Sequence, residues 1–155
     1  MSQSIRPAPV RRSVMVKASQ ARAFEVFTDG FGRWWPQTHH IGKLAMKTGV
    51  IEPRVGGRWY EVGEDGTQCE WGKVLVWEPP RRLVLGWQLN AQWQYDPALL
   101  TEVEILFTSE GDATRVDLEH RNLERFGVDA EKVRESVGSP RGWGAILESF
   151  AQATR

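Results

Sequence analysis

The chain has 155 residues, which is long enough for one domain with a sizeable hydrophobic core. Twenty basic residues balance twenty acidic residues, so no net charge attracts nucleic acid or an anionic membrane surface. The single cysteine, Cys69, excludes an intramolecular disulfide, and no apolar run approaches the roughly 20 residues that span a bilayer. We therefore expect a soluble, cytoplasmic protein without nucleic-acid or membrane partners.

The amino-terminal end predicts a flexible arm. Residues 1–9 are polar and contain prolines, so we expect this arm to precede one domain that spans 10–155. Four basic residues gather near this end, and we interpret them as solvated side chains rather than as a nucleic-acid contact: Arg6, Arg11, Arg12 and Lys17.

Turn-forming residues divide the chain up to residue 121 into short elements. Ser19 can cap a first helix, and Pro36 ends a second one because the residue before a proline avoids the helical region. Glycine, proline and aspartate then separate three hairpins, which predict a mainly antiparallel sheet. The predicted order is strand, helix, helix and six strands: 10–17, 20–28, 31–35, 49–54, 58–62, 68–77, 82–89, 100–108 and 114–121.

Alternation along these strands predicts that one face of the sheet is apolar. In the strand 100–108, Val103 and Ile105 alternate with Glu102 and Glu104. An antiparallel sheet that is covered on one side has this pattern. We interpret the two glutamates as solvated, because they lie opposite the apolar face.

The carboxy-terminal residues predict a helix that covers the apolar face. Ser139 can cap its first turn, and Pro140 stands where the missing N–H of proline costs nothing. A shorter helix before it is predicted to be capped by Asp129 and ended by Gly138. In the last helix, spacings of three, four and seven place four large apolar residues on one side: Trp143, Ile146, Leu147 and Phe150.

Short sequences spread over residues 11–153 carry a resemblance to a known family. They are Val16–Phe27, Trp34-Trp35, Gly56–Trp59, Gly72–Leu83, Thr114–Val116, His120 and Gly142-Trp143. Together they resemble the AHSA-like branch, the homologues of the activator of the heat-shock-protein-ninety ATPase, within the START-like (SRPBCC) superfamily that includes the birch-pollen allergens. The resemblance implies an α+β helix-grip fold, in which a curved antiparallel β-sheet wraps around a long carboxy-terminal helix and two short helices follow the first strand. Members bind apolar or polycyclic ligands between sheet and helix, a few catalyse cyclisation or dehydration there, and the namesake stimulates a chaperone.

A ligand-binding cavity is the function that these patterns favour. Eight tryptophans are hard to pack without voids, and aromatic walls with a few polar groups are typical of sites for apolar ligands. We expect a small apolar or aromatic ligand between the sheet and the last helix, and no cofactor. The predicted wall residues are Trp35, Trp59, Trp71, Trp87, Val103, Ile105, His120, Trp143, Leu147 and Phe150.

Two other classes of function stay open. A cyclase, dehydratase or hydrolase needs a buried acid or base, and His120 shares a face with Val116 and Leu118 under the last helix. A core histidine bonded to the backbone explains the same pattern, so no catalytic residue is assigned. His39 and His40 are adjacent and diverge on any regular element, so we interpret them as a surface loop rather than a metal site. A co-chaperone or stress-response module and a homodimer are the remaining hypotheses.

Overall fold

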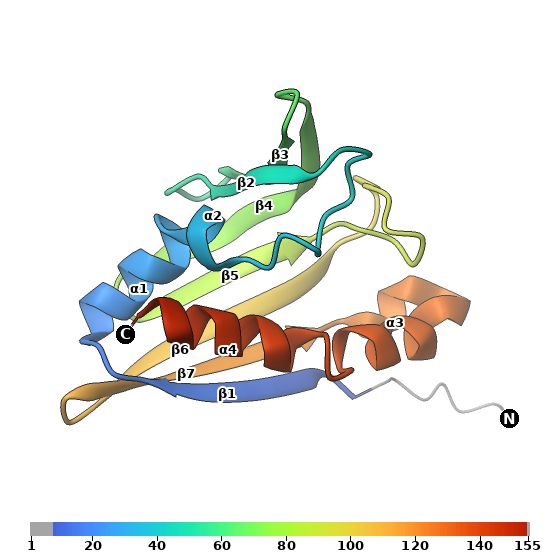
Figure 1. Cartoon of the computed structure of the whole chain (residues 1–155). Helices are drawn as coiled ribbons and strands as arrows, with labels where there is room; N and C mark the ends of the chain where they lie inside the picture. The colour runs from blue at the N-terminus through green and yellow to red at the C-terminus, as the bar shows by residue number, and fades with distance from the viewer. Residues whose placement is uncertain (1–7, 155) are drawn as a thin grey trace, which may run out of the picture.

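The structure of the chain, a computed structural model, describes residues 8–154 (Figure 1). The expected flexible arm therefore lies almost wholly outside the described residues. In this part of the chain, no helix has both the length and the hydropathy that crossing a membrane requires. The elements are β1 Val10–Val16, α1 Gln20–Thr28, α2 Phe31–Trp34, β2 Met46–Ile51, β3 Arg58–Gly63, β4 Gln68–Glu78, β5 Arg82–Trp87, β6 Thr101–Glu110, β7 Ala113–Arg121, the 3-10 helix η1 Leu123–Asp129, α3 Ala130–Val137 and α4 Trp143–Ala153.

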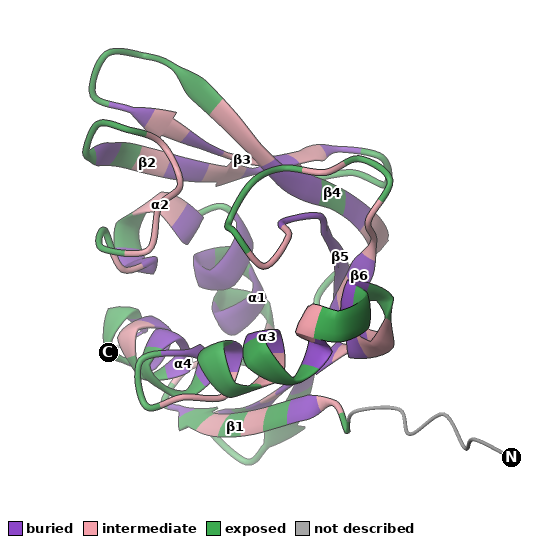
Figure 2. Ribbon diagram, turned by 90° about the vertical axis from the view of Figure 1, so that its right-hand side faces the viewer, coloured by how far each residue is buried: buried purple, intermediate pink, exposed green. Residues whose placement is uncertain are grey.

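The seven strands form one antiparallel sheet in the order β1-β7-β6-β5-β4-β3-β2. Figure 1 shows that the sheet curls, so that α1 and α4 lie within its concave side. In Figure 2 the buried residues (purple) of the helices and strands face this shared interior. The curled sheet, the two short helices after β1 and the carboxy-terminal helix confirm the predicted α+β helix-grip fold.

Apolar side chains of the central strands face the concave side, as their alternation predicts. Val103 and Ile105 of β6 are fully buried. Strand β5 departs from simple alternation, because Gly86 on its other face is buried as well. The Leu100 side chain lies against it, only 2.6 Å from where a Cβ on Gly86 would stand. The segment 88–100, here named the β5–β6 loop, therefore ends with a side chain that packs on the strand that it follows.

The convex side of the sheet carries a network of ion pairs, which corrects the interpretation of the two glutamates of β6 as simply solvated. The Arg121 guanidinium contacts Glu102 at 2.9 Å, Glu104 at 3.1 Å and Glu119 at 3.1 Å. Arg82 donates to Glu104 at 2.7 Å. Cross-strand neighbours bring these charges together because β5, β6 and β7 pair in register. These side chains are only partly buried, so each pair contributes on the order of 1 kcal/mol or less to stability.

The starts of two helices test the capping predictions. Ser19 caps α1 as predicted, because its hydroxyl oxygen accepts a hydrogen bond from Arg22 N at 3.2 Å. The prediction that Ser139 caps the last helix is wrong. Its hydroxyl donates to the Ser136 carbonyl at 2.8 Å, and α4 begins four residues later than Ser139 with Gly142 as an N-cap that has no side chain to offer.

The segment 138–142, here named the α3–α4 turn, connects α3 to α4. The last helix was expected to begin within this segment, at Ser139, but it begins after it. Asp129 stands at the N-cap position of α3 without a side-chain hydrogen bond, and Gly138 ends that helix as predicted. The chain then reverses so tightly that a Cβ on Gly142 would lie 2.0 Å from the Val137 carbonyl oxygen. This turn places the first residue of α4, Trp143, beside the open end of the sheet.

Candidate ligand-binding cavity

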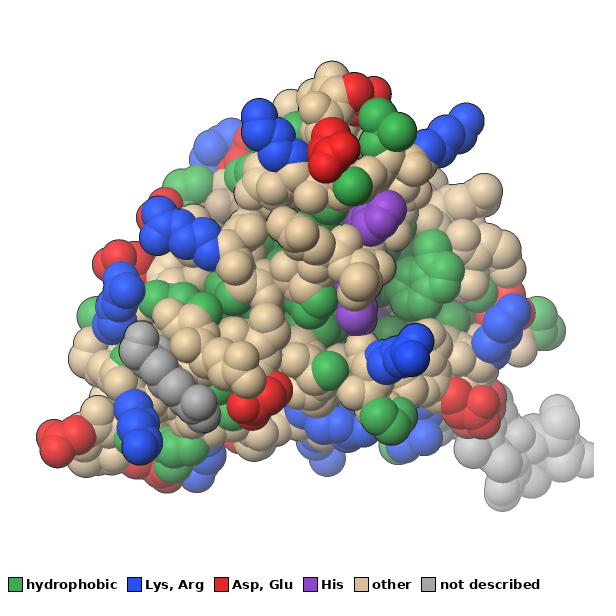
Figure 3. Space-filling view, viewed as in Figure 1, with side chains coloured by type: hydrophobic (Ala, Val, Ile, Leu, Met, Phe, Trp, Pro, Cys, Tyr) green, Lys and Arg blue, Asp and Glu red, His purple; other side chains and the backbone are tan. Residues whose placement is uncertain are grey.

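A cavity of about 460 Å³ opens on the surface at the amino end of α4. Three loops surround it: the segment 36–45 (the mouth loop), the β5–β6 loop and the α3–α4 turn. Its volume falls in the range of roughly 300–1,000 Å³ that is typical of small-molecule sites. Figure 3 shows histidine (purple) and hydrophobic (green) side chains next to one another on this face.

Five tryptophans from different elements and loops form the apolar wall: Trp35, Trp71, Trp87, Trp93 and Trp143. The ring centroids of Trp35 and Trp71 are 5.1 Å apart, those of Trp87 and Trp143 are 5.6 Å apart, and the planes of the second pair meet at 67°. Tilted and edge-to-face contacts are the arrangements that aromatic rings prefer, and they fix the ring orientations. The wall therefore offers preformed apolar surfaces to a ligand.

Trp93 reaches the cavity from a strained position in the β5–β6 loop. Its φ of 61° lies in the left-handed region, which is costly for a bulky residue. Asn90 holds the loop in this shape, because its carboxamide oxygen accepts from Gln92 N at 2.9 Å and from Gln94 N at 3.0 Å. The Asn90 carbonyl accepts from Trp93 N at 2.9 Å. The loop thus holds an aromatic ring at the opening, 44% of it exposed.

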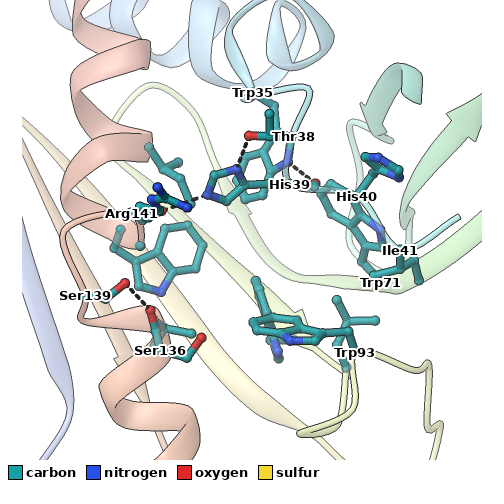
Figure 4. A pocket seen from close by; sticks show the side chains of 16 residues that line it. Trp35, Thr38, His39, His40, Ile41, Trp71, Trp93, Ser136, Ser139 and Arg141 are labelled. Atoms are coloured by element: carbon teal, nitrogen blue, oxygen red, sulfur yellow. Dashed lines mark hydrogen bonds between the residues drawn. The ribbon is translucent and has the colours of Figure 1, made fainter. Parts of the chain in front are cut away.

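Polar groups form the rim of the cavity: Thr38, His39, His40, Ser136, Ser139 and Arg141. His39 joins two of the loops, because Nε2 donates to the Arg141 carbonyl at 2.7 Å while Nδ1 lies 3.0 Å from the Thr38 hydroxyl (Figure 4). Nδ1 of His40 donates to the Gly42 carbonyl at 3.0 Å. Among the described residues that line the cavity, none is an aspartate or glutamate. The rim therefore carries only neutral and cationic groups.

His120 lies behind the wall and not on the cavity lining. It is fully buried, and its Nδ1 accepts from Trp143 Nε1 at 3.1 Å. That bond places the proton of a neutral ring on Nε2, which donates to the Thr101 hydroxyl at 2.9 Å. Thr101 in turn donates to the Trp87 carbonyl at 3.2 Å. Burial lowers the pKa of His120 to about 3, so the ring is neutral at physiological pH.

Glu61 of β3 is a second buried polar residue, and the sequence patterns do not predict a role for it. Its carboxylate accepts hydrogen bonds from Ile41 N at 2.6 Å, from Gly42 N at 3.1 Å and from Trp71 Nε1 at 2.9 Å. Three donors compensate for the removal of a charged group from water. Glu61 therefore fastens the mouth loop to the sheet and sets the orientation of one wall ring.

The ten predicted wall residues divide into two groups. Four of them line the cavity: Trp35, Trp71, Trp87 and Trp143. Six are buried in the core without lining it: Trp59, Val103, Ile105, His120, Leu147 and Phe150. The sequence patterns missed Trp93 and the polar rim, which all lie in loops or helix ends where no periodicity assigns a direction. The adjacent histidines His39 and His40 were the sequence feature that could have indicated the polar rim, but they were interpreted as a surface loop.

Aromatic side chains fill the other end of the space between sheet and helix. Phe150 of α4 packs on Phe27 at 5.1 Å and on Trp34 at 5.3 Å between ring centroids. Phe107 of β6 packs on Phe24 at 5.1 Å. These rings close the interior near the carboxyl end of α4. The cavity is consequently confined to the end that the mouth loop and the α3–α4 turn surround.

The chemistry that the site can perform follows from these groups. Within residues 8–154, no three His, Cys, Asp or Glu side chains come together in an arrangement that could hold a metal ion. The tryptophan wall can bury a flat apolar molecule, and the rim can exchange hydrogen bonds with polar substituents at its edge. Among the described residues, the rim groups are the ones placed to exchange a proton with a ligand, because His120 does not line the cavity and both of its nitrogens are occupied.

A comparison with protein families decides which family the fold represents. The model described as "Activator of Hsp90 ATPase homolog 1-like protein" matches residues 17–155. The chain belongs to this family. The match covers every element after β1, and it confirms the resemblance that the local sequences carry. No curated protein matches the sequence.

Several solved structures are similar to this family member over nearly their whole length. An anthrahydroquino-γ-pyrone synthase, Txn09, complexed with SUM, is 38% identical, with 96% of this chain and 97% of that chain covered and a TM-score of 0.67. The self-sacrificing resistance protein CalC from Micromonospora echinospora is 39% identical, with 94% and 92% covered and a TM-score of 0.70. The Aha1 dimer from Colwellia psychrerythraea is 16% identical, with 96% of each chain covered and a TM-score of 0.63, and it shows the fold alone.

Proposed function

We propose that the chain binds a small, flat, mainly apolar molecule of fused aromatic rings in the cavity at the amino end of α4. The observation that carries this proposal is the wall of five tryptophans around a cavity of about 460 Å³. Each Å² of apolar ligand surface that these rings cover contributes roughly 25 cal/mol to binding. The five lining tryptophans contact the ligand, and the six predicted wall residues behind them support the rings.

The similar solved structures support an aromatic ligand. A synthase that is 38% identical is named for an anthrahydroquino-γ-pyrone, which is a fused aromatic skeleton. Its similarity covers 96% of this chain. A ligand of the same general shape suits the tilted rings of the wall, because flat molecules can stack on one ring and meet the edge of the next.

Titration with an uncharged three-ring probe, 2-(hydroxymethyl)anthraquinone, tests the proposal. We expect a dissociation constant on the order of 10 µM, which corresponds to about 7 kcal/mol. Ser136 is exposed and lines the opening, so Ser136→Trp should block entry and weaken binding at least about tenfold. Glu135→Trp is the matched control, because this neighbour on α3 is exposed and does not line the cavity. The proposal fails if the wild-type protein does not bind the probe, or if Ser136→Trp binds it as well as Glu135→Trp.

An enzyme that cyclises an aromatic precursor is the second candidate, and the synthase among the similar structures favours it. The version that uses His120 is disfavoured, since this ring is neutral, doubly bonded and off the lining. His40 is better placed as a base, because it lines the cavity and its Nε2 has no hydrogen-bond partner among the described residues. Mass spectrometry of a bound precursor before and after incubation distinguishes turnover from binding.

Contact with a chaperone, a role in the stress response and formation of a homodimer stay predictions. The family description supports the first, and a solved dimer of the same fold supports the last. Recovery of a chaperone from cell lysate and the mass in solution are the respective measurements.

A further inference from the structure

We propose that the molecule bound in this cavity carries a carboxylate at one end and that Arg141 binds it. The inference rests on the proposed function, because it concerns a ligand of the same cavity. The proposed ligand is then an aromatic carboxylic acid rather than a neutral aromatic molecule. Its carboxylate end would lie at the α3–α4 turn.

The groups that line the cavity support an anionic ligand. The Glu61 carboxylate lies behind the lining, where Ile41 N, Gly42 N and Trp71 Nε1 already donate to it. The lining contains one guanidinium and two imidazoles, and no described lining residue is acidic. Eight other arginines form ion pairs with aspartate or glutamate. The Arg141 side chain forms no hydrogen bond or ion pair with another described residue, although its backbone carbonyl is bonded. An arginine without a carboxylate partner at the edge of an apolar cavity is suited to bind a carboxylate that arrives with the ligand.

The backbone of Arg141 is held in place before any ligand binds. Its carbonyl accepts from His39 Nε2 at 2.7 Å, which joins the α3–α4 turn to the mouth loop. The next residue, Gly142, donates its N–H to the Ser139 carbonyl at 2.9 Å. Only the side chain of Arg141 must become ordered on binding, so little conformational entropy is lost per hydrogen bond formed.

The arrangement of the lining residues gives the ligand a direction. Figure 4 shows Arg141 and Ser139 on one side of the cavity and Trp71 and Trp93 on the opposite side. A flat molecule that lies against these rings presents its other end to the guanidinium. Arginine binds a carboxylate with two parallel hydrogen bonds, which are stronger than hydrogen bonds between neutral groups. Arg141 is exposed, so salt should screen the attraction and low salt should strengthen it.

Two matched probes test the inference. Anthraquinone-2-carboxylate and anthraquinone-2-carboxamide have nearly the same shape, and only the first is charged. At low salt we expect the wild-type protein to bind the carboxylate about tenfold more tightly than the carboxamide. Arg141→Gln should weaken carboxylate binding about tenfold, to the level of the carboxamide. Carboxamide binding should weaken much less, because only a hydrogen bond to a neutral group changes. Lys132→Gln is the control, because it removes an exposed positive charge of α3 that does not line the cavity.

The outcomes separate this inference from the proposed function. Equal affinities of the wild-type protein for the two probes would overturn the inference and leave the aromatic site intact. Loss of carboxylate affinity in Lys132→Gln as large as in Arg141→Gln would overturn it as well, because a general field would then explain the preference. Failure of both probes to bind would contradict the proposed function itself, and the inference with it.

Discussion

His120 is a buried titratable residue whose two ring nitrogens are both occupied by hydrogen bonds. The bonds run in one direction, from Trp143 to His120, from His120 to Thr101 and from Thr101 to the carbonyl of Trp87. Two of these four residues are wall rings of the cavity. The histidine therefore acts as a positioning residue that holds the Trp143 indole in the wall, and its neutral form is the form that fits.

This assignment predicts a pH dependence of stability. The pKa of His120 is about 3 in the folded protein and near 6.5 when unfolded, so acid protonates the unfolded state first and destabilises the fold. Between pH 7.5 and pH 5 the residue should remove about 2 kcal/mol from the free energy of unfolding, with the loss beginning as pH falls through 6.5. Urea titrations at the two pH values measure this loss, and His120→Gln should lack it.

Two results would contradict this role for His120. One is an equal loss of stability between pH 7.5 and pH 5 in the wild-type protein and in His120→Gln, since the other two histidines are common to both. The other is a nitrogen NMR spectrum of the wild-type ring that shows protonation above pH 5. The second measurement does not require the variant to fold.

The sequence predicts that the His120 side chain faces the interior, but it does not predict which residues form hydrogen bonds with it. Alternation in β7 places His120 inside, and the structure agrees. The bonding partners Thr101 and Trp143 lie 19 and 23 residues away in the sequence, so no local pattern could identify them. The alternative considered for His120 was a hydrogen bond to the backbone. In the structure the ring instead forms hydrogen bonds with two side chains.

At the scale of elements, the α3–α4 turn determines where the cavity ends. Capping patterns predict a helix start at Ser139, because serine followed by proline is a common beginning of a helix. The close approach of Gly142 to the end of α3 overrides this preference, since residue 142 must be a glycine for the reversal to form. The strands were easier to predict, because their alternation and turns are local signals that the sheet preserves. The exception is β2, which spans Met46–Ile51 where a strand over 49–54 was predicted.

The two glycines that flank Trp143 should respond in opposite ways to alanine. Gly142→Ala would place a Cβ 2.0 Å from the Val137 carbonyl oxygen, and we expect a loss of about 2 kcal/mol or more in the free energy of unfolding. Gly144→Ala meets no atom closer than 3.9 Å, so its higher helix propensity should stabilise the protein by roughly 0.5–1 kcal/mol. Thermal unfolding of both variants measures these changes. Equal effects of the two substitutions would show that the turn is not as tight as described.

At the scale of the whole molecule, the interior is divided between packed rings and an open cavity. The family resemblance and the many tryptophans predict a ligand cavity between sheet and helix, and its binding of a ligand stays a prediction. In the structure, residues of the sheet and of α4 line a cavity at the amino end of that helix. The resemblance and the tryptophans do not predict which end of the space between sheet and helix stays open, because this depends on how the rings of distant elements meet. Phe27, Phe107 and Phe150 fill one end, whereas loops that carry no periodic pattern surround the other.

The indole NMR signals of the tryptophans test whether an aromatic ligand binds in this cavity. The chain has eight tryptophans, and five of them line the cavity. Addition of 2-(hydroxymethyl)anthraquinone should shift the indole N–H signals of the lining residues, including Trp71, Trp93 and Trp143, because ring currents of a stacked ligand act over a few Å. Trp77, which packs on Phe24 with ring centroids 5.1 Å apart and does not line the cavity, should keep its position. Unchanged spectra, or shifts confined to Trp77, would show that the cavity does not bind the ligand.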